Sequence, residues 1–109
     1  MSTNPPQQQT VKLTAEQALD QAIAHHRAGR YQAAERFYRA ILQAQPNHPA
    51  ANHGLGDLLM DVGQHAAGIP YLKTALAIDP SQRQYLLSYA RALVAFGQAR
   101  EALHILQTA

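Results

Sequence analysis

The sequence predicts an all-α protein in which three helix-turn-helix repeats stack into a short solenoid. Glycine recurs at a spacing of 34 residues, at Gly29, Gly63 and Gly97. The same spacing relates positions 22, 56 and 90, positions 34, 68 and 102, positions 38, 72 and 106, positions 41, 75 and 109, and the prolines at 46 and 80. Small, large and helix-breaking residues that share one period indicate stacked copies of one unit rather than a single globular core.

Length and composition agree with this interpretation. The chain of 109 residues has room for about three such units. Its hydrophobic fraction of 47% is typical of a folded protein, and much of that fraction is alanine, which favours helices and lets them approach closely. With five Tyr, two Phe and no Trp, the chain lacks the side chains for a thick aromatic core.

The breaks in the pattern predict where each helix begins and ends. Helices are expected at residues 15–28, 31–44, 49–62, 66–78, 82–96 and 99–109. The recurring glycines directly follow the first helix of each pair, where a left-handed residue closes the helix. Pro46 and Pro80 end the second helices, because proline cannot continue a helix.

Polar residues are expected to cap the helix starts. Thr14 and Gln17 have the spacing of a capping box, in which a hydroxyl and an amide satisfy the free N–H groups of the first turn. Asn47 and Ser81 are expected to cap the first helices of the second and third repeats.

The chain divides into a leader and one repeat domain. Residues 1–13 are polar and cannot bury enough surface to offset their ordering entropy, so a disordered leader is expected. The domain then spans residues 14–109, with repeats at approximately 15–48, 49–82 and 83–109. Because the third repeat stops in mid-helix, we expect either a piece cut from a longer protein or an end that a second copy covers.

Charge and cysteine content exclude several classes of function. The chain has nine Lys and Arg against seven Asp and Glu, a net charge of +2 that is too small and too interspersed to predict nucleic-acid binding. The absence of cysteine excludes disulfides and thiolate sites. The first residues do not form a secretory signal, and no run approaches the ~20 apolar residues that span a bilayer. We expect a soluble, cytoplasmic protein without a nucleic-acid or membrane partner.

The repeated residues match a known family pattern. The middle repeat carries small and large residues at Leu55, Gly56, Leu59, Gly63, Gly68, Tyr71, Leu72, Ala75 and Pro80, and the flanking repeats keep much of this pattern. The chain therefore resembles the tetratricopeptide repeat (TPR) family, as an array of bacterial type. Small residues at 22, 56 and 90 are expected where helices approach closely, and Tyr38, Leu72 and Leu106 are expected to fill the space between layers.

This resemblance implies a right-handed solenoid whose first helices line a concave groove that binds a protein or peptide. The expected function is a protein-interaction scaffold without catalytic residues, cofactor or metal. The residues expected to line the groove are Leu19, Ile23, His26, His53, Asp57, Met60, Leu87, Arg91 and Val94. The lysine and asparagine clamp with which some members hold a C-terminal carboxylate is missing at positions 19, 23, 54, 84 and 88.

Three biological contexts remain open. Segments 28–30, 35–39 and 46–49 look like bacterial arrays that precede transferase domains, including glycosyltransferases and sulfotransferases. The repeats also resemble secretion chaperones that hold a client protein in the groove. A third possibility is a self-associating adaptor, a homodimer through the uncapped C-terminal end, where Leu103, Ile105 and Leu106 are expected to be exposed.

Two patterns raise the question of chemistry. His53, Asp57 and Asp61 recur at every fourth residue of one helix, a spacing that a divalent metal can use. A solvated polar stripe is the preferred interpretation. Ser88 is not expected to have a histidine and an aspartate within reach, so no nucleophile is predicted.

Overall fold

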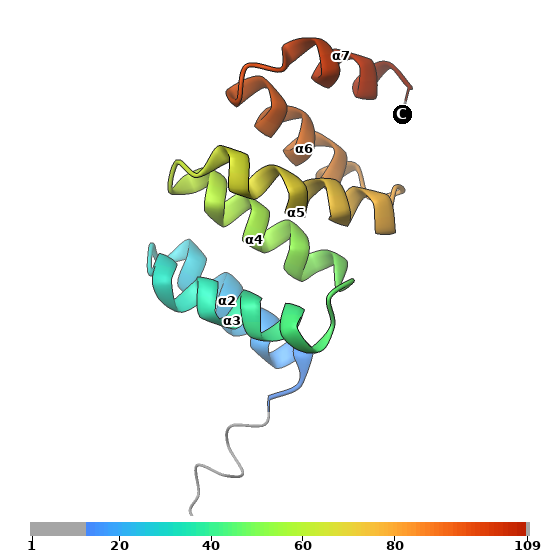
Figure 1. The fold of residues 1–109 in the computed structure, drawn as a ribbon. Helices are drawn as coiled ribbons and strands as arrows, with labels where there is room; N and C mark the ends of the chain where they lie inside the picture. Colours follow the sequence, from blue (N-terminus) through green and yellow to red (C-terminus); the bar gives the residue numbers. More distant parts are fainter. Residues whose placement is uncertain (1–12, 109) are drawn as a thin grey trace, which may run out of the picture.

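The computed structural model describes residues 13–108, which form helices without any strand (Figure 1). The helices are α2 (Ala15–Arg27), α3 (Tyr31–Ala44), α4 (Pro49–Asp61), α5 (His65–Ile78), α6 (Arg83–Ala95) and α7 (Ala99–Thr108). The all-α prediction is confirmed, and the expected helix ends agree to within one residue over the described range. The leader prediction falls almost entirely on residues 1–12, which lie outside that range.

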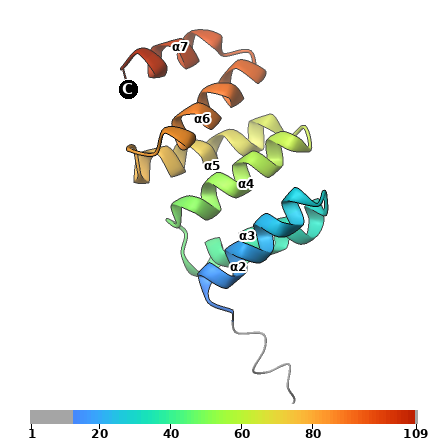
Figure 2. The same ribbon diagram turned by 180° about the vertical axis from the view of Figure 1, so that it is seen from behind.

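The helices stack as three antiparallel pairs along one axis, with α2 and α3 at one end and α7 at the other (Figures 1 and 2). The first helices of the second and third pairs pack against both helices of the preceding pair. Helix α4 packs against α2 and α3, and α6 packs against α4 and α5. The three first helices α2, α4 and α6 therefore lie side by side along one flank of the array.

The turns within the pairs are built on the recurring glycines. Gly29, Gly63 and Gly97 have φ values of 79°, 83° and 85°, which lie in the left-handed region. The Gly29 N–H donates to the His26 carbonyl and the next N–H donates to the His25 carbonyl, at 3.0 and 2.8 Å. This is a Schellman arrangement that satisfies the last carbonyls of the helix. The same pattern follows α4 and α6.

The residues that cap the helix starts agree only partly with the sequence prediction. The Thr14 and Gln17 capping box is present, with both bonds at 3.0 Å. The expectation that Asn47 and Ser81 cap the next first helices is wrong. Pro49 occupies the first position of α4, which places the cap at His48, whose Nδ1 accepts from the Ala51 N–H at 3.1 Å.

In the third repeat, too, the cap position lies one residue after the predicted one. Its helix α6 begins at Arg83, so the cap position is Gln82, which makes no side-chain capping bond. The Ser81 hydroxyl instead donates to the Asp79 carboxylate at 2.7 Å, within the turn.

Small residues stand where helices approach most closely. A Cβ added to Gly68 of α5 would lie 2.8 Å from the Gly56 carbonyl oxygen of α4, and a Cβ added to Gly56 would lie 2.6 Å from the Leu72 side chain. Leu72 is fully buried, as expected for a residue between layers. Leu106, at the same position of the third repeat, is instead exposed, because no later helix of the described chain covers α7.

Candidate functional site

A groove runs over α2, α4 and α6 as two adjoining cavities of about 440 and 380 Å³. We call them the α2–α4 cavity and the α4–α6 cavity. His26 and Asp57 line both, so they stand at the boundary between them. The α2–α4 cavity is otherwise lined by Leu19, Ile23, Arg27, Tyr38, Ala50, His53, Gly54, Gln84 and Tyr85, and the α4–α6 cavity by Met60, Asp61, Ser88, Arg91, Ala92 and Ala95.

The structure brings together most of the residues expected to line the groove. Leu19, Ile23, His26, His53, Asp57, Met60 and Arg91 line one cavity or both. Leu87 and Val94 line neither. They occupy the α6 positions that correspond to His53 and Met60 on α4, and they are 44% and 55% exposed because no further first helix of the described chain packs on α6.

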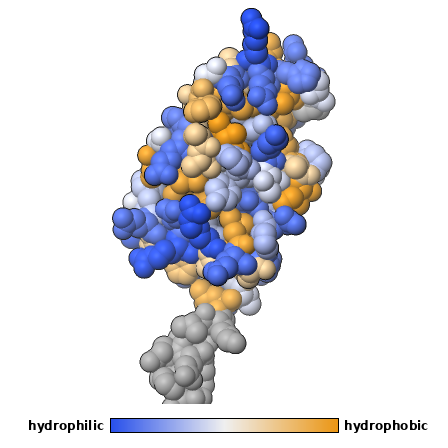
Figure 3. Space-filling model, in the orientation of Figure 1, coloured by the Kyte–Doolittle hydropathy of each residue, from blue (hydrophilic) through white to orange (hydrophobic). Residues whose placement is uncertain are grey.

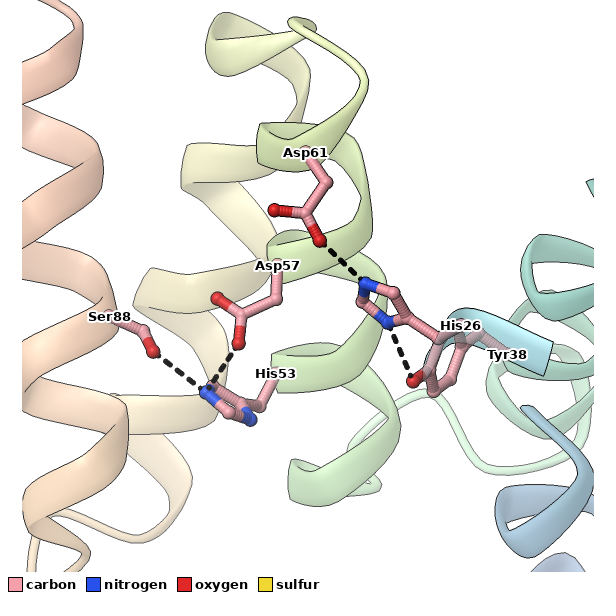
Figure 4. Close-up of polar contacts among 6 residues, drawn as sticks. All are labelled: His26, Tyr38, His53, Asp57, Asp61 and Ser88. Carbon is pink, nitrogen blue, oxygen red and sulfur yellow. Dashed lines mark hydrogen bonds and ion pairs between the residues drawn. The ribbon is translucent and has the colours of Figure 1, made fainter. Parts of the chain in front are cut away.

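His26 connects the first repeat to the second (Figure 4). Its Nε2 lies 2.7 Å from Asp61 Oδ2 on α4, and its Nδ1 lies 3.3 Å from the Tyr38 hydroxyl. A carboxylate only accepts hydrogen bonds, so Nε2 donates to Asp61. In the neutral ring, Nδ1 then accepts from the Tyr38 hydroxyl, and both ring nitrogens are satisfied.

Tyr38 belongs to the second helix α3 yet reaches the groove through a gap that Gly54 leaves in α4. A Cβ added to Gly54 would lie 2.5 Å from the Tyr38 Cζ and 2.8 Å from its hydroxyl. The Tyr38 side chain is almost completely buried. Burial, followed by the negative charge of Asp57, raises its pKa to about 12, so the hydroxyl keeps its proton for His26.

His53 connects the second repeat to the third. Its Nε2 lies 2.9 Å from Ser88 Oγ on α6 and 3.2 Å from Asp57 Oδ2, and its ring lies against Tyr85 at a centroid distance of 4.8 Å. Burial lowers the pKa of His53; Asp57 opposes this shift and Arg91 adds to it. The imidazole is therefore neutral at neutral pH.

The expectation that Ser88 has no histidine or aspartate within reach is wrong, since both His53 and Asp57 lie beside it. The arrangement still does not form a catalytic triad. Ser88 and Asp57 contact the same ring nitrogen of His53, whereas a triad requires the carboxylate on the opposite nitrogen. Ser88 is also almost completely buried, with an exposed fraction of only 3%.

The histidine and carboxylate stripe on α4 is divided between two different contacts. Asp57 pairs with His53 of the same helix, whereas Asp61 pairs with His26 of α2. Within residues 13–108, no group of three histidine, cysteine or acidic side chains has the geometry to hold a metal ion.

Sequence reasoning missed Asn52 as a structural residue. This buried side chain donates to the carbonyls of Pro46 and His48 at 3.0 and 2.9 Å and thereby fixes the linker between the first two repeats. Tyr38 was also missed as part of the groove, whereas Gly54 was expected on the concave face. The sequence did contain a signal for this contact. Tyr38 and Gly54 differ together from the residues at the same positions one repeat later, which are Leu72 and Ser88.

The comparisons with known proteins identify the family. The family model described as "Tetratricopeptide repeat" matches residues 25–68 and 59–109. The chain belongs to the tetratricopeptide repeat family. The matching family model is not that of an enzyme family, and no curated protein matches the sequence. Of the helices in the described range, none is long and apolar enough to cross a membrane.

Two kinds of protein with solved structures illustrate the shared fold. A mutant O-GlcNAc transferase of Thermobaculum terrenum is 29% identical, with a TM-score of 0.81; the match covers 98% of this chain and 19% of that one. Two MamA structures are 24% and 20% identical, with TM-scores of 0.77 and 0.75. The matches cover 85% and 86% of this chain but 51% and 52% of the MamA chains, so the TPR domain spans about half of their length.

Proposed function

We propose that this TPR domain is a protein-interaction scaffold whose groove binds an extended segment of a partner protein. The observation that carries the proposal is the pair of adjoining cavities over all three repeats. Their walls combine apolar Leu19, Ile23 and Met60 with charged Asp57 and Arg91. A concave surface with apolar walls and a few placed polar groups is typical of a ligand site.

The contacts between repeats support this role because they hold the groove in shape before a ligand arrives. His26 to Asp61 and His53 to Ser88 each join neighbouring first helices with short hydrogen bonds. A preformed groove binds more tightly than one that must be ordered during binding.

Selection of peptides from a displayed library on the immobilised domain tests the proposal. Selected peptides are expected to lose at least about tenfold in affinity for an Ile23→Asp variant, because a charge replaces an apolar wall of the groove. A matched Ala77→Asp variant, at an exposed position of α5, is expected to bind like the wild type. Equal binding to all three proteins would place the site outside the groove.

We further propose that the domain is the N-terminal module of a larger bacterial protein such as a glycosyltransferase or a sulfotransferase. The similarity to a stretch of the Thermobaculum terrenum O-GlcNAc transferase supports the first of these. The reading frame beyond residue 109 tests the idea: a transferase domain there is expected, and a stop codon would refute it. The cytoplasmic location stays a prediction.

A second candidate function is self-association through the outer face of α6 and α7. This face exposes Leu87, Val94, Leu103 and Leu106, whereas Ile105, expected to be exposed, packs inward against the α5–α6 core. The equivalents of Val94, Leu103 and Leu106 in the second repeat are covered where the third repeat packs on it. The uncovered face is therefore shaped to receive a helix.

A two-fold dimer fits this face better than a head-to-tail chain. The opposite end of the array carries exposed Gln17 and Gln21 at the positions of Ala51 and Leu55, which are buried in the second repeat. Sedimentation equilibrium at increasing concentration tests dimerisation. A dimer that dissociates in a Leu103→Glu variant is expected, and a wild-type protein that stays monomeric would refute it.

A further inference from the structure

Three groove residues at one position of successive repeats differ in chemical character. Ile23, Asp57 and Arg91 are each 34 residues apart, on α2, α4 and α6 respectively. Ile23 and Asp57 line the α2–α4 cavity, and Asp57 and Arg91 line the α4–α6 cavity. The middle of the groove therefore presents an apolar, then an acidic, then a basic side chain along its length.

Contacts across the groove show that residues one repeat apart lie next to each other. The two histidine bridges join positions 35 residues apart: His26 with Asp61, and His53 with Ser88 (Figure 4). Ile23, Asp57 and Arg91 each lie three or four residues, about one helical turn, from a bridged residue of the same helix, and so they lie on the same helix faces as the bridges. The row Ile23, Asp57 and Arg91 thus crosses the three first helices in sequence.

The two charges in this row are available to a ligand. Asp57 Oδ2 contacts His53 at 3.2 Å, and the Asp57 side chain remains 32% exposed. Arg91 is exposed, and it forms no ion pair with any residue of the described part of the chain, although it lines the same cavity as Asp57. A second acidic residue, Asp61, lines that cavity from α4 as well.

Helix spacing sets the distance between matching groups of a ligand. Packed helices lie about 8–10 Å apart, and a chain in the extended polyproline II conformation advances about 3.1 Å per residue with three residues per turn, so every third side chain points to the same side. Neighbouring positions of the row are therefore about three residues apart along a bound extended peptide.

We propose that the groove recognises an extended peptide with an apolar, a basic and an acidic residue at every third position. The apolar residue packs beside Ile23, the basic residue pairs with Asp57, and the acidic residue pairs with Arg91. Opposite charges placed in this order fix the register of the peptide and disfavour peptides with the charges exchanged. This inference rests on the proposed function of the groove and specifies its ligand.

Fluorescence anisotropy with synthetic peptides tests the pattern. Two labelled peptides carry leucine, lysine and glutamate at every third position, with serine between them. One peptide has this order and the other has the reverse order, because an extended peptide can bind in either direction. Two matched controls exchange the lysine and the glutamate. One of the first two is expected to bind about tenfold more tightly than its control at low salt, with a smaller difference at high salt.

Two variants of the domain connect this preference to the row. Asp57→Asn combined with Arg91→Gln removes both charges with little change in volume and is expected to abolish the preference. Asp57→Arg combined with Arg91→Asp is expected to reverse it, and circular dichroism verifies that both variants are folded. Absence of binding by all four peptides, equal binding of peptide and control, or a preference that both variants retain would overturn the proposal.

The failure of this inference is distinguishable from failure of the groove function. Peptides that bind regardless of charge order, and that lose affinity for the Ile23→Asp variant, would refute the charge pattern and retain the groove. Library-selected peptides that bind the Ile23→Asp variant as tightly as the wild type would refute both the charge pattern and the groove function.

Discussion

Replacement of Gly54 by alanine tests how Tyr38 reaches the groove. Alanine at an ordinary helix position stabilises a helix relative to glycine by about 1 kcal/mol. Here the added Cβ would lie 2.5 Å from the Tyr38 Cζ and 2.8 Å from its hydroxyl, well inside van der Waals contact. The buried ring must move, which costs about 1–3 kcal/mol in overpacking. Displacement also breaks the hydrogen bond to His26, worth about 1 kcal/mol.

The expected net effect of Gly54→Ala is a loss of about 1–3 kcal/mol in the free energy of unfolding. The higher helix propensity of alanine offsets only part of the overpacking and of the lost hydrogen bond. In a Tyr38→Leu background the same substitution is expected to stabilise by up to about 1 kcal/mol. The next repeat already has this combination. Leu72 and Ser88 occupy the positions of Tyr38 and Gly54, so a side chain on the first helix is compatible with leucine on the second.

Urea unfolding followed by circular dichroism measures both effects, and the double-mutant cycle gives the coupling directly. A coupling of about 2 kcal/mol or more with a change of sign is expected. If Gly54→Ala changed stability equally in both backgrounds, the steric argument would be refuted and Tyr38 would not pass through the Gly54 gap.

Three further predictions follow from single contacts. Burial lowers the pKa of His53 below its ordinary value of 6.5, so the unfolded chain binds more protons at acidic pH; the urea midpoint is expected to fall as pH decreases from neutral through about 6, and less so in a His53→Gln variant. Asn52→Ala removes two buried hydrogen bonds to the linker and is expected to cost about 1–3 kcal/mol in a thermal melt, against no change for exposed Gln43→Ala. Gly68→Ala places a Cβ 2.8 Å from the Gly56 carbonyl and is expected to lower the melting temperature; an unchanged melt would contradict the close approach of α4 and α5.

Much of the fold follows from one period in the sequence. Positions 34 residues apart must have equivalent surroundings in a stack, so Gly29, Gly63 and Gly97 predict three identical turns, which the structure contains. The sequence also predicts the start of α2, because the Thr14 and Gln17 bonds are local. Local patterns therefore suffice wherever the partner lies within a few residues.

Contacts between repeats could not be read from the same pattern. Ser88 meets His53 because neighbouring first helices bring together residues 35 apart, an offset that depends on how the helices cross rather than on the period. The cap at His48 was missed because histidine is not a preferred cap, and Pro49 alone sets its position.

Figure 3 shows the hydropathy of the side on which α3 lies in front of α2. On that face hydrophilic and hydrophobic side chains are interspersed over the helices, without one broad apolar area. The groove is distinguished by its shape and by the groups that converge on Asp57, which are known only once α2, α4 and α6 are placed beside one another.

The proposed function places the partner on the surface formed by α2, α4 and α6. NMR titration of the ¹⁵N-labelled domain with a library-selected peptide tests it most directly, because each backbone amide reports its own surroundings. The largest changes in chemical shift are expected to cluster at the backbone amides of Ile23, Asp57 and Arg91. Changes confined to α3, α5 and α7, with these three amides unmoved, would contradict it.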